Sequence, residues 1–312
     1  MNDTLALKKE LFTKKDIIAT ISISAIYLLL SNILVGYKSD QLVLVLVFNA
    51  LYYCSVFTRK FILGFSIFIV YWIVFDYMKA FPNYLYGSVN IEQLYNLEKS
   101  WFRISLNGRI ITPNEYWVAN QNVFLDIMGG IFYLLWIPVP LAFATYLFFR
   151  NRKQYLYFSL TFVLVNFLGF VVYYLYPAAP PWYVQYYGFT FQESTLSNPA
   201  GLLRFDQHLS TPVFQAIYSK GSNVFAAMPS LHSSYPVVVL YYSIKNKLKI
   251  SNIFFVVVML GIWFTAVYSG HHYILDVLAG IICAWIGIVL FNYLKEVKVV
   301  KSFIRSMLIL IC

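Results

Sequence analysis

Long apolar runs separated by short polar stretches recur along this chain of 312 residues. A bilayer core about 30 Å thick is crossed by about 20 helical residues. The runs are continuous and do not alternate with a period of two, which favours helices over a β-barrel. We therefore predict an all-α, polytopic transmembrane helix bundle with about eight spans, at residues 17–35, 41–57, 61–76, 127–149, 154–176, 225–244, 250–268 and 272–294.

Polar stretches divide the chain into four regions. We expect N-terminal transmembrane helices in 1–76, an extracytoplasmic interfacial segment in 77–126, a transmembrane core in 127–294 and a cytoplasmic basic tail in 295–312. The segment 77–126 is too polar to span a membrane. An amphipathic pattern within it predicts a short helix at the membrane surface, formed by Ile91, Leu94, Tyr95, Leu97, Glu98, Trp101 and Phe102. This segment is either a solvated loop that caps the bundle or a lid over a lipid site.

Composition and charge support a membrane protein and fix its expected orientation. The chain is 60% hydrophobic and 12% charged, which excludes an ordinary soluble domain. Its net charge of +10 does not indicate nucleic acid, because an inside N-terminus places most basic residues in cytoplasmic loops and tails. These residues are Lys8, Lys9, Lys14, Lys15, Arg59, Lys60, Arg150, Arg152, Lys153, Lys245, Lys247, Lys249, Lys295, Lys298, Lys301 and Arg305. Both termini are therefore expected in the cytoplasm.

The three cysteines lie in apolar surroundings without paired spacing. Buried small side chains are therefore a better interpretation of these residues than a disulfide or a metal site.

A His–Asp pair begins the last predicted span. His272 and Asp276 are four residues apart, so in one helix their side chains share a face. A carboxylate that binds one imidazole nitrogen leaves the other nitrogen free as a nucleophile or base. The alternative is a structural pair that anchors the helix end.

A second motif, Pro229-Ser230-Leu231-His232, predicts the start of another span. Proline suits the first helical position, and free backbone N–H groups at a helix start bind phosphate. His232 would lie beside that phosphate as an acid or base, on the same outer face as His272. A metal site formed by His232, His271, His272 and Asp276 is the chemical alternative, but adjacent histidines on a helix diverge by about 100°. We therefore expect that the site holds no metal. We expect His271 to line the wall of the site.

Prolines and aromatic residues begin the outer loop at about 177–224. Prolines end the preceding helix, and Trp and Tyr favour the headgroup level of a membrane. Pro181, Trp182 and Tyr183 are therefore either lipid contacts or simply an aromatic belt after a helix stop.

These motifs resemble those of the type 2 phosphatidic acid phosphatase superfamily, which carries Pro-Ser-Gly-His and Ser-Arg-x5-His-x3-Asp. The chain is most similar to the sphingolipid synthase branch, notably the inositol phosphorylceramide synthases, in three runs: Ala179–Trp182, Pro229–His232 and His271–Asp276. The resemblance covers about residues 170–285. It implies a superfamily-like core in which His272 is the nucleophile on phosphorus, Asp276 orients it and His232 is the acid and base. It also implies that no metal or organic cofactor is required.

The chain departs from the superfamily pattern at the expected arginine. Ala266 stands six residues before His272, where the superfamily has Arg. A phosphomonoester brings about two negative charges and needs such cations, whereas a phosphodiester brings one. Substrate contacts are then expected from Ser230, His271, Pro181, Trp182 and Tyr183, with Arg204 or Lys220 as a replacement cation.

The hypothesis is a transferase that moves a phosphorylated headgroup, phosphoinositol in the first instance, from a glycerophospholipid to a ceramide-type alcohol. The alternatives are a lipid phosphate or polyprenyl diphosphate phosphatase, and a catalytically inactive lipid binder or transporter. The partners expected are a phosphatidylinositol-like donor, a ceramide-like acceptor and the membrane, with no nucleic acid. The active site is expected on the extracytoplasmic face, periplasmic or luminal.

Overall fold

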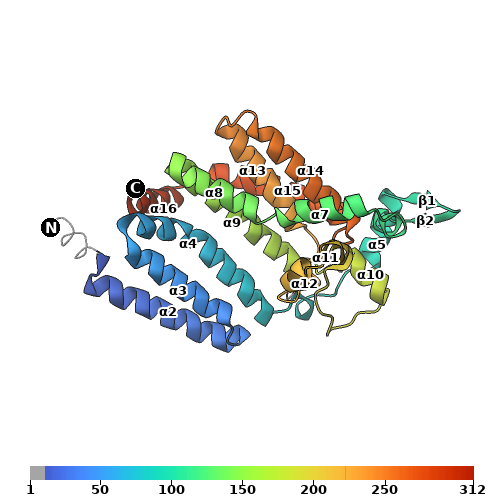
Figure 1. The fold of residues 1–312 in the computed structure, drawn as a ribbon, viewed down its shortest axis with the longest axis horizontal. Helices are drawn as coiled ribbons and strands as arrows, with labels where there is room; N and C mark the ends of the chain where they lie inside the picture. The colour runs from blue at the N-terminus through green and yellow to red at the C-terminus, as the bar shows by residue number, and fades with distance from the viewer. Residues whose placement is uncertain (1–10, 222) are drawn as a thin grey trace. The chain divides into compact units, whose positions relative to one another are not determined.

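The computed structural model describes residues 11–221 and 223–312, so Lys8 and Lys9 of the charge pattern lie outside the described residues. The chain forms two compact units. The first holds α2 (Lys14–Val35), α3 (Ser39–Cys54), α4 (Val56–Tyr77), η1 (Met78–Ala80) and α16 (Lys298–Ile311), together with the start of α9 (Arg152–Leu175). Within this unit α3 packs on α4, as does α16 (Figure 1). The C-terminal tail, which the sequence pattern marked only as basic, forms the helix α16.

The second unit carries the remaining elements. They are η2 (Asn83–Leu85), α5 (Glu92–Trp101), β1 (Ile104–Leu106), β2 (Arg109–Ile111), α6 (Pro113–Ala119), α7 (Val123–Leu134), α8 (Pro138–Arg150), most of α9, α10 (Pro181–Tyr187), η3 (Ala200–Leu202), α11 (Leu203–Leu209), α12 (Val213–Tyr218), α13 (Leu231–Lys245), α14 (Ser251–Tyr268) and α15 (Ile274–Leu294). Helix α13 packs against both α14 and α15 (Figure 1).

The predicted membrane helix bundle is confirmed. Among the described residues, six helical segments are long and apolar enough to span a membrane: Lys14–Val35, Val56–Ala80, Val123–Arg150, Arg152–Leu175, Ser251–Tyr268 and Ile274–Leu294. Two further predicted spans correspond to the shorter helices α3 and α13.

Two predicted spans differ from the observed helices because of proline. The single span at 127–149 is divided into α7 and α8 by a turn before Pro138, since proline disfavours helical backbone in the residue ahead of it. The span at 225–244 starts later, because Ser230 is the N-cap of α13 and Pro229 precedes that cap. The expectation of Pro229 at the first helical position was therefore wrong.

The segment 77–126 contains the predicted amphipathic helix, α5, and a hairpin that the sequence analysis missed. Strands β1 and β2 pair antiparallel with Leu106 opposite Arg109. Asn107 and Gly108 form the turn with φ of 51° and 76°. Asn-Gly is the preferred pair for a two-residue hairpin turn, so the signal was present in the sequence.

Three loops of the second unit lie side by side and bring the motifs together. Ala178 forms isolated parallel bridges with Asn90 and with Ala226. The Ala178 amide donates to the Phe225 carbonyl at 2.9 Å, and the Asn90 amide donates to the Pro177 carbonyl at 2.8 Å. The proline-rich loop is therefore joined on one side to the approach to α5 and on the other to the approach to α13.

Candidate active site

His232 and His272 face each other although they are 40 positions apart in sequence. The Nδ1 atom of His232 lies 3.3 Å from the Nε2 atom of His272. His232 is in the first turn of α13, and His272 lies in the connection between α14 and α15. The structure thus brings together the two histidines that the sequence analysis placed on one face.

The close packing of α13 on α15 brings the His232 and His272 rings together. A Cβ atom at Gly280 of α15 would lie 2.2 Å from the Ser230 carbonyl oxygen. The Ser230 amide donates to the Asp276 carbonyl at 2.9 Å, and Ser234 Oγ donates to the Gly280 carbonyl at 2.7 Å. Ser230 is fully buried and its Oγ caps α13 by accepting from the Ser233 amide.

The His272–Asp276 pair is present but not within one helix. Helix α15 starts at Ile274, so His272 precedes it. Gly270, with φ of 75°, turns the chain at the end of α14, and the amides of His271 and His272 both donate to the Ala266 carbonyl. Nδ1 of His272 lies 3.6 Å from Oδ2 of Asp276, which is beyond hydrogen-bonding distance. The same Oδ2 accepts from the Tyr273 amide at 2.8 Å.

Both histidines of the α14–α15 connection are buried. Burial lowers the pKa of His272 to about 4, which favours the neutral imidazole that a nucleophile requires. Burial also lowers the pKa of His271, and its Nδ1 lies 3.0 Å from Ser269 Oγ. The His271 ring lies against Tyr218, with ring centroids 4.7 Å apart.

Two aromatic residues that the sequence analysis missed contact His232. Tyr133 of α7 is fully buried, and its hydroxyl lies 3.1 Å from His232 Nδ1. Trp136, in the turn between α7 and α8, lies edge-on to His232 with ring centroids 4.4 Å apart. Single aromatic residues inside an apolar span give no sequence signal.

Ala266, which stands where the superfamily has arginine, lies in an apolar environment. Ala266 is fully buried in a cluster with Tyr133, Leu202, Phe205, Phe214 and Val277. A small apolar side chain therefore stands where the superfamily carries its arginine.

Arg204 is instead paired with Asp126 of α7. Its Nε donates to Asp126 Oδ1 at 2.6 Å, and Tyr268 donates to the same oxygen at 2.8 Å. His208 Nε2 lies 3.2 Å from the other carboxylate oxygen. The buried Nη2 of Arg204 makes no hydrogen bond within the described residues. Lys220 lies exposed after α12.

Pro181, Trp182 and Tyr183 form the buried first turn of α10. The Trp182 amide donates to the Gly270 carbonyl at 2.9 Å, beside the histidines. The Trp182 and Tyr183 side chains pack in a cluster with Ile91 and Phe225. Their contact with lipid stays a prediction.

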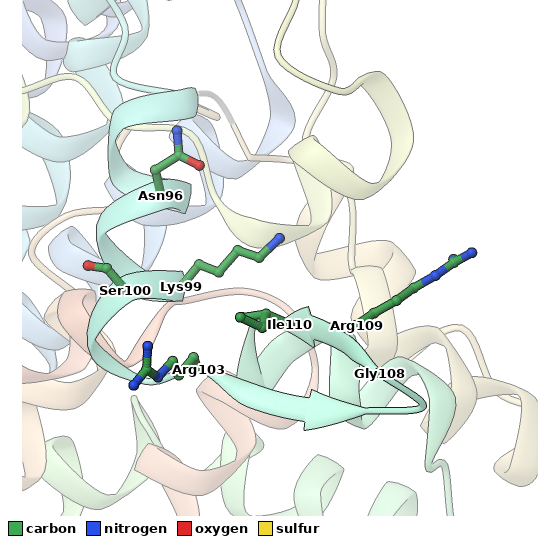
Figure 2. A pocket seen from close by; sticks show the side chains of 7 residues that line it. All are labelled: Asn96, Lys99, Ser100, Arg103, Gly108, Arg109 and Ile110. Carbon is green, nitrogen blue, oxygen red and sulfur yellow. The ribbon is translucent and has the colours of Figure 1, made fainter.

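A cavity of about 780 Å³ lies between α5 and the β1–β2 hairpin (Figure 2). Its lining contains no histidine and consists of Asn96, Lys99, Ser100, Arg103, Gly108, Arg109 and Ile110. This basic surface is therefore distinct from the histidine cluster. Across residues 11–221 and 223–312, no group of three or more His, Cys, Asp or Glu side chains is arranged to hold a metal ion.

The sequence profile of the PAP2 superfamily matches residues 92–290, a range that includes every one of these site residues. The chain belongs to the PAP2 superfamily. Membership agrees with the resemblance inferred from the two histidine motifs.

Relatives of this PAP2 superfamily chain include a phosphoinositol dihydroceramide synthase of Bacteroides thetaiotaomicron. The two are 43% identical over 294 residues, which cover 93% of this chain and 96% of that protein. The catalytic subunit of inositol phosphorylceramide synthase from Saccharomyces cerevisiae is 27% identical over 259 residues, covering 80% of this chain and 62% of the yeast protein. The inositol phosphorylceramide synthase of Candida albicans is 26% identical over 185 residues, covering 56% of this chain and 38% of that protein. No solved structure matches the chain.

Proposed function

We propose that this protein transfers phosphoinositol from a phosphatidylinositol-like donor to the hydroxyl of a ceramide-type lipid and releases diacylglycerol. One observation carries the proposal. The facing pair of His232 and His272 lies in a chain that is 43% identical, over 93% of its length, to a phosphoinositol dihydroceramide synthase.

His272 is the proposed nucleophile. Its Nδ1 faces Asp276, so Nε2 is the nitrogen directed at the substrate. Nε2 attacks the donor phosphorus and forms a P–N bond while the P–O bond to diacylglycerol breaks. Catalytic hydrogen bonds are often long before substrate binds, so the 3.6 Å contact with Asp276 is expected to shorten as charge develops on the ring.

His232 is the proposed acid and base. Protonated His232 gives its proton to the departing diacylglycerol oxygen. It then takes a proton from the ceramide hydroxyl, whose oxygen attacks phosphorus and breaks the P–N bond. The cycle leaves His232 protonated and His272 neutral, so atoms and charges balance. Two imidazoles 3.3 Å apart repel when both are charged, so the anionic donor serves as the counterion of protonated His232.

The charge of the donor is the main specificity element. Ala266 cannot supply the superfamily cation, and Arg204 is largely neutralised by Asp126. The buried Nη2 of Arg204 keeps an unused donor. We therefore expect phosphodiester lipids, with one negative charge, to be much better donors than phosphomonoester lipids.

Substrate contacts are proposed for Ser230, His271, Pro181, Trp182, Tyr183, Arg204 and Lys220. We also propose that both termini are cytoplasmic and that the site opens to the extracytoplasmic face. This orientation follows from the distribution of basic residues.

The test is reconstitution in liposomes with a ceramide-type acceptor and donors that carry inositol, ethanolamine, choline or glycerol. Mass spectrometry should detect the inositol-phosphorylated product together with diacylglycerol. Release of inorganic phosphate from monoester lipids, without a new headgroup lipid, would identify the phosphatase alternative instead.

His272→Ala should abolish transfer, because it removes the nitrogen proposed to form the P–N bond. The matched control is His208→Ala, which removes a histidine outside both motifs; it loses only a contact with Asp126, so its activity should fall far less than that of His272→Ala. Transfer that survives His272→Ala would contradict the proposed nucleophile.

A further inference from the structure

Helix α5 presents two different faces. Its outer residues Asn96, Lys99 and Ser100 border the basic cavity (Figure 2). Its inner face includes Glu98, a carboxylate with no exposed surface. Buried carboxylates are rare unless their oxygens are paired.

Both oxygens of Glu98 bind the start of α15. Oε1 accepts from the Ile274 amide at 3.0 Å, and Oε2 accepts from the Leu275 amide at 3.1 Å. The first amides of a helix have no partner within the helix, and the helix dipole favours a negative charge there. Glu98 therefore acts as an N-terminal cap supplied from 176 residues away in sequence.

The other side of His272 is held by the same segment of the chain. Asn114 Nδ2 donates to the His272 carbonyl at 2.9 Å and to the Val267 carbonyl at 2.8 Å. The backbone of His272 is thus fixed at two points. Asn114 binds its carbonyl, and Glu98 binds the amides of Ile274 and Leu275, which follow it. Both residues come from 77–126.

We propose that Glu98 is a positioning residue that, with Asn114, fixes the backbone of His272 so that its ring stays between Asp276 and His232. This inference rests on the proposed role of His272 as nucleophile. It assigns the segment 77–126 a direct part in building the active site, beyond capping the bundle.

The cap also has a pH dependence. Burial, together with the Asp276 charge, raises the pKa of Glu98 to about 7 against the lowering effect of the two amides. Tyr273 lies within electrostatic reach of Glu98 and Asp276, and also of Tyr95 and Glu115. Only the ionised carboxylate offers two full acceptors, so the cap weakens as pH falls through about 7.

The experiment compares Glu98→Gln with Glu92→Gln, the same substitution at an exposed position of the same helix. Headgroup transfer is measured in detergent from pH 5.5 to 9. We expect Glu98→Gln to lower kcat about 10- to 100-fold at pH 8, with KM changed less than about threefold. We expect the kcat of the wild type to fall as the pH is lowered through about 7, and Glu98→Gln to lack this fall. Glu92→Gln should keep the wild-type profile.

Hydrogen exchange without substrate provides a readout that is independent of the reaction. Peptides covering 270–278 should exchange faster in Glu98→Gln and in Asn114→Ala than in the wild type, and those of Glu92→Gln should not. Unchanged exchange, or a kcat and pH profile of Glu98→Gln equal to the wild type, would overturn the positioning role. If the wild type instead released inorganic phosphate, the proposed function would fail, and the same kinetic comparison on that reaction would test Glu98.

Discussion

His232 Nδ1 lies 3.3 Å from His272 Nε2, and the same His232 nitrogen lies 3.1 Å from the hydroxyl of Tyr133. Three groups thus share one small space at the start of α13. In the proposed mechanism Nε2 of His272 attacks the phosphorus, so we expect the substrate phosphate to enter between the two rings. The pair is expected to act as one unit.

The first prediction concerns this coupling. His272→Ala should remove transfer, and His232→Ala should lower kcat about 10²- to 10⁴-fold, the usual contribution of a general acid or base. The double variant should be no slower than His272→Ala alone, because groups that act as a unit are not additive. Single-turnover kinetics with a labelled donor measure this, and additive losses would show that the two histidines act independently.

The low pKa of His272 predicts how stability depends on pH. The unfolded chain protonates this ring below about pH 6.5, whereas the folded protein protonates it only near pH 4. Its contribution to stability is therefore complete above pH 6.5 and declines as pH falls toward 4, by at most about 1.4 kcal/mol per pH unit.

Glu98 acts in the opposite direction, because its folded pKa is raised from 4.5 to about 7. The measurement that separates the two is the thermal unfolding midpoint of wild type against His272→Gln across pH. As the pH is lowered from 6.5 to 4, the unfolding midpoint of His272→Gln should rise relative to that of the wild type. Parallel curves would contradict the lowered pKa of His272.

The close contact between α13 and α15 at Gly280 predicts that a larger side chain there lowers both folding stability and kcat. The added methyl group of Gly280→Ala would meet the Ser230 carbonyl, which is backbone and cannot rotate away. We expect about 1–3 kcal/mol of destabilisation and a large fall in kcat, since α13 carries His232. The control is Gly287→Ala, where the methyl group meets the side chain of Val165. It should lose stability while the folded fraction keeps its kcat.

Asp126 and Arg204 form a mostly buried ion pair, with side-chain exposures of 4% and 17%. Removal of one partner leaves an uncompensated charge, so Arg204→Met should cost about 3–5 kcal/mol of folding stability. The double variant Asp126→Leu/Arg204→Met should recover much of that loss. If the double variant regains stability but keeps a raised KM for the donor, Arg204 also contacts the phosphate. A fully restored KM would limit Arg204 to a structural role.

Sidedness is tested by labelling in a cysteine-free background. Ser194 lies exposed in the proposed outer loop, and Lys247 lies exposed in a proposed cytoplasmic loop. Ser194→Cys should react with a membrane-impermeant maleimide in intact cells, and Lys247→Cys only after the membrane is opened. The reverse pattern would invert the proposed topology.

The pattern of apolar residues was sufficient for the bundle because a spanning helix must be about 20 residues long and must satisfy its own backbone. Differences arose where proline or glycine changes the local backbone. A turn before Pro138 interrupts the helix of one predicted span, although Val123–Arg150 remains one apolar segment long enough to cross a membrane. The turn at Gly270 ends α14 and leaves His272 outside α15. The Asn107-Gly108 hairpin was readable from the sequence but was missed.

The sequence by itself determined the family and singled out His232, His272 and Asp276, whose identities and spacing lie in two short motifs. Only the tertiary structure decided how these groups are held. Glu98, Asn114 and Tyr133 reach the site from elements more than 90 residues away in sequence. Their side chains satisfy buried amides, carbonyls or ring nitrogens that exist only after the helices have packed. Local patterns cannot predict such partners, because the need for them arises from burial.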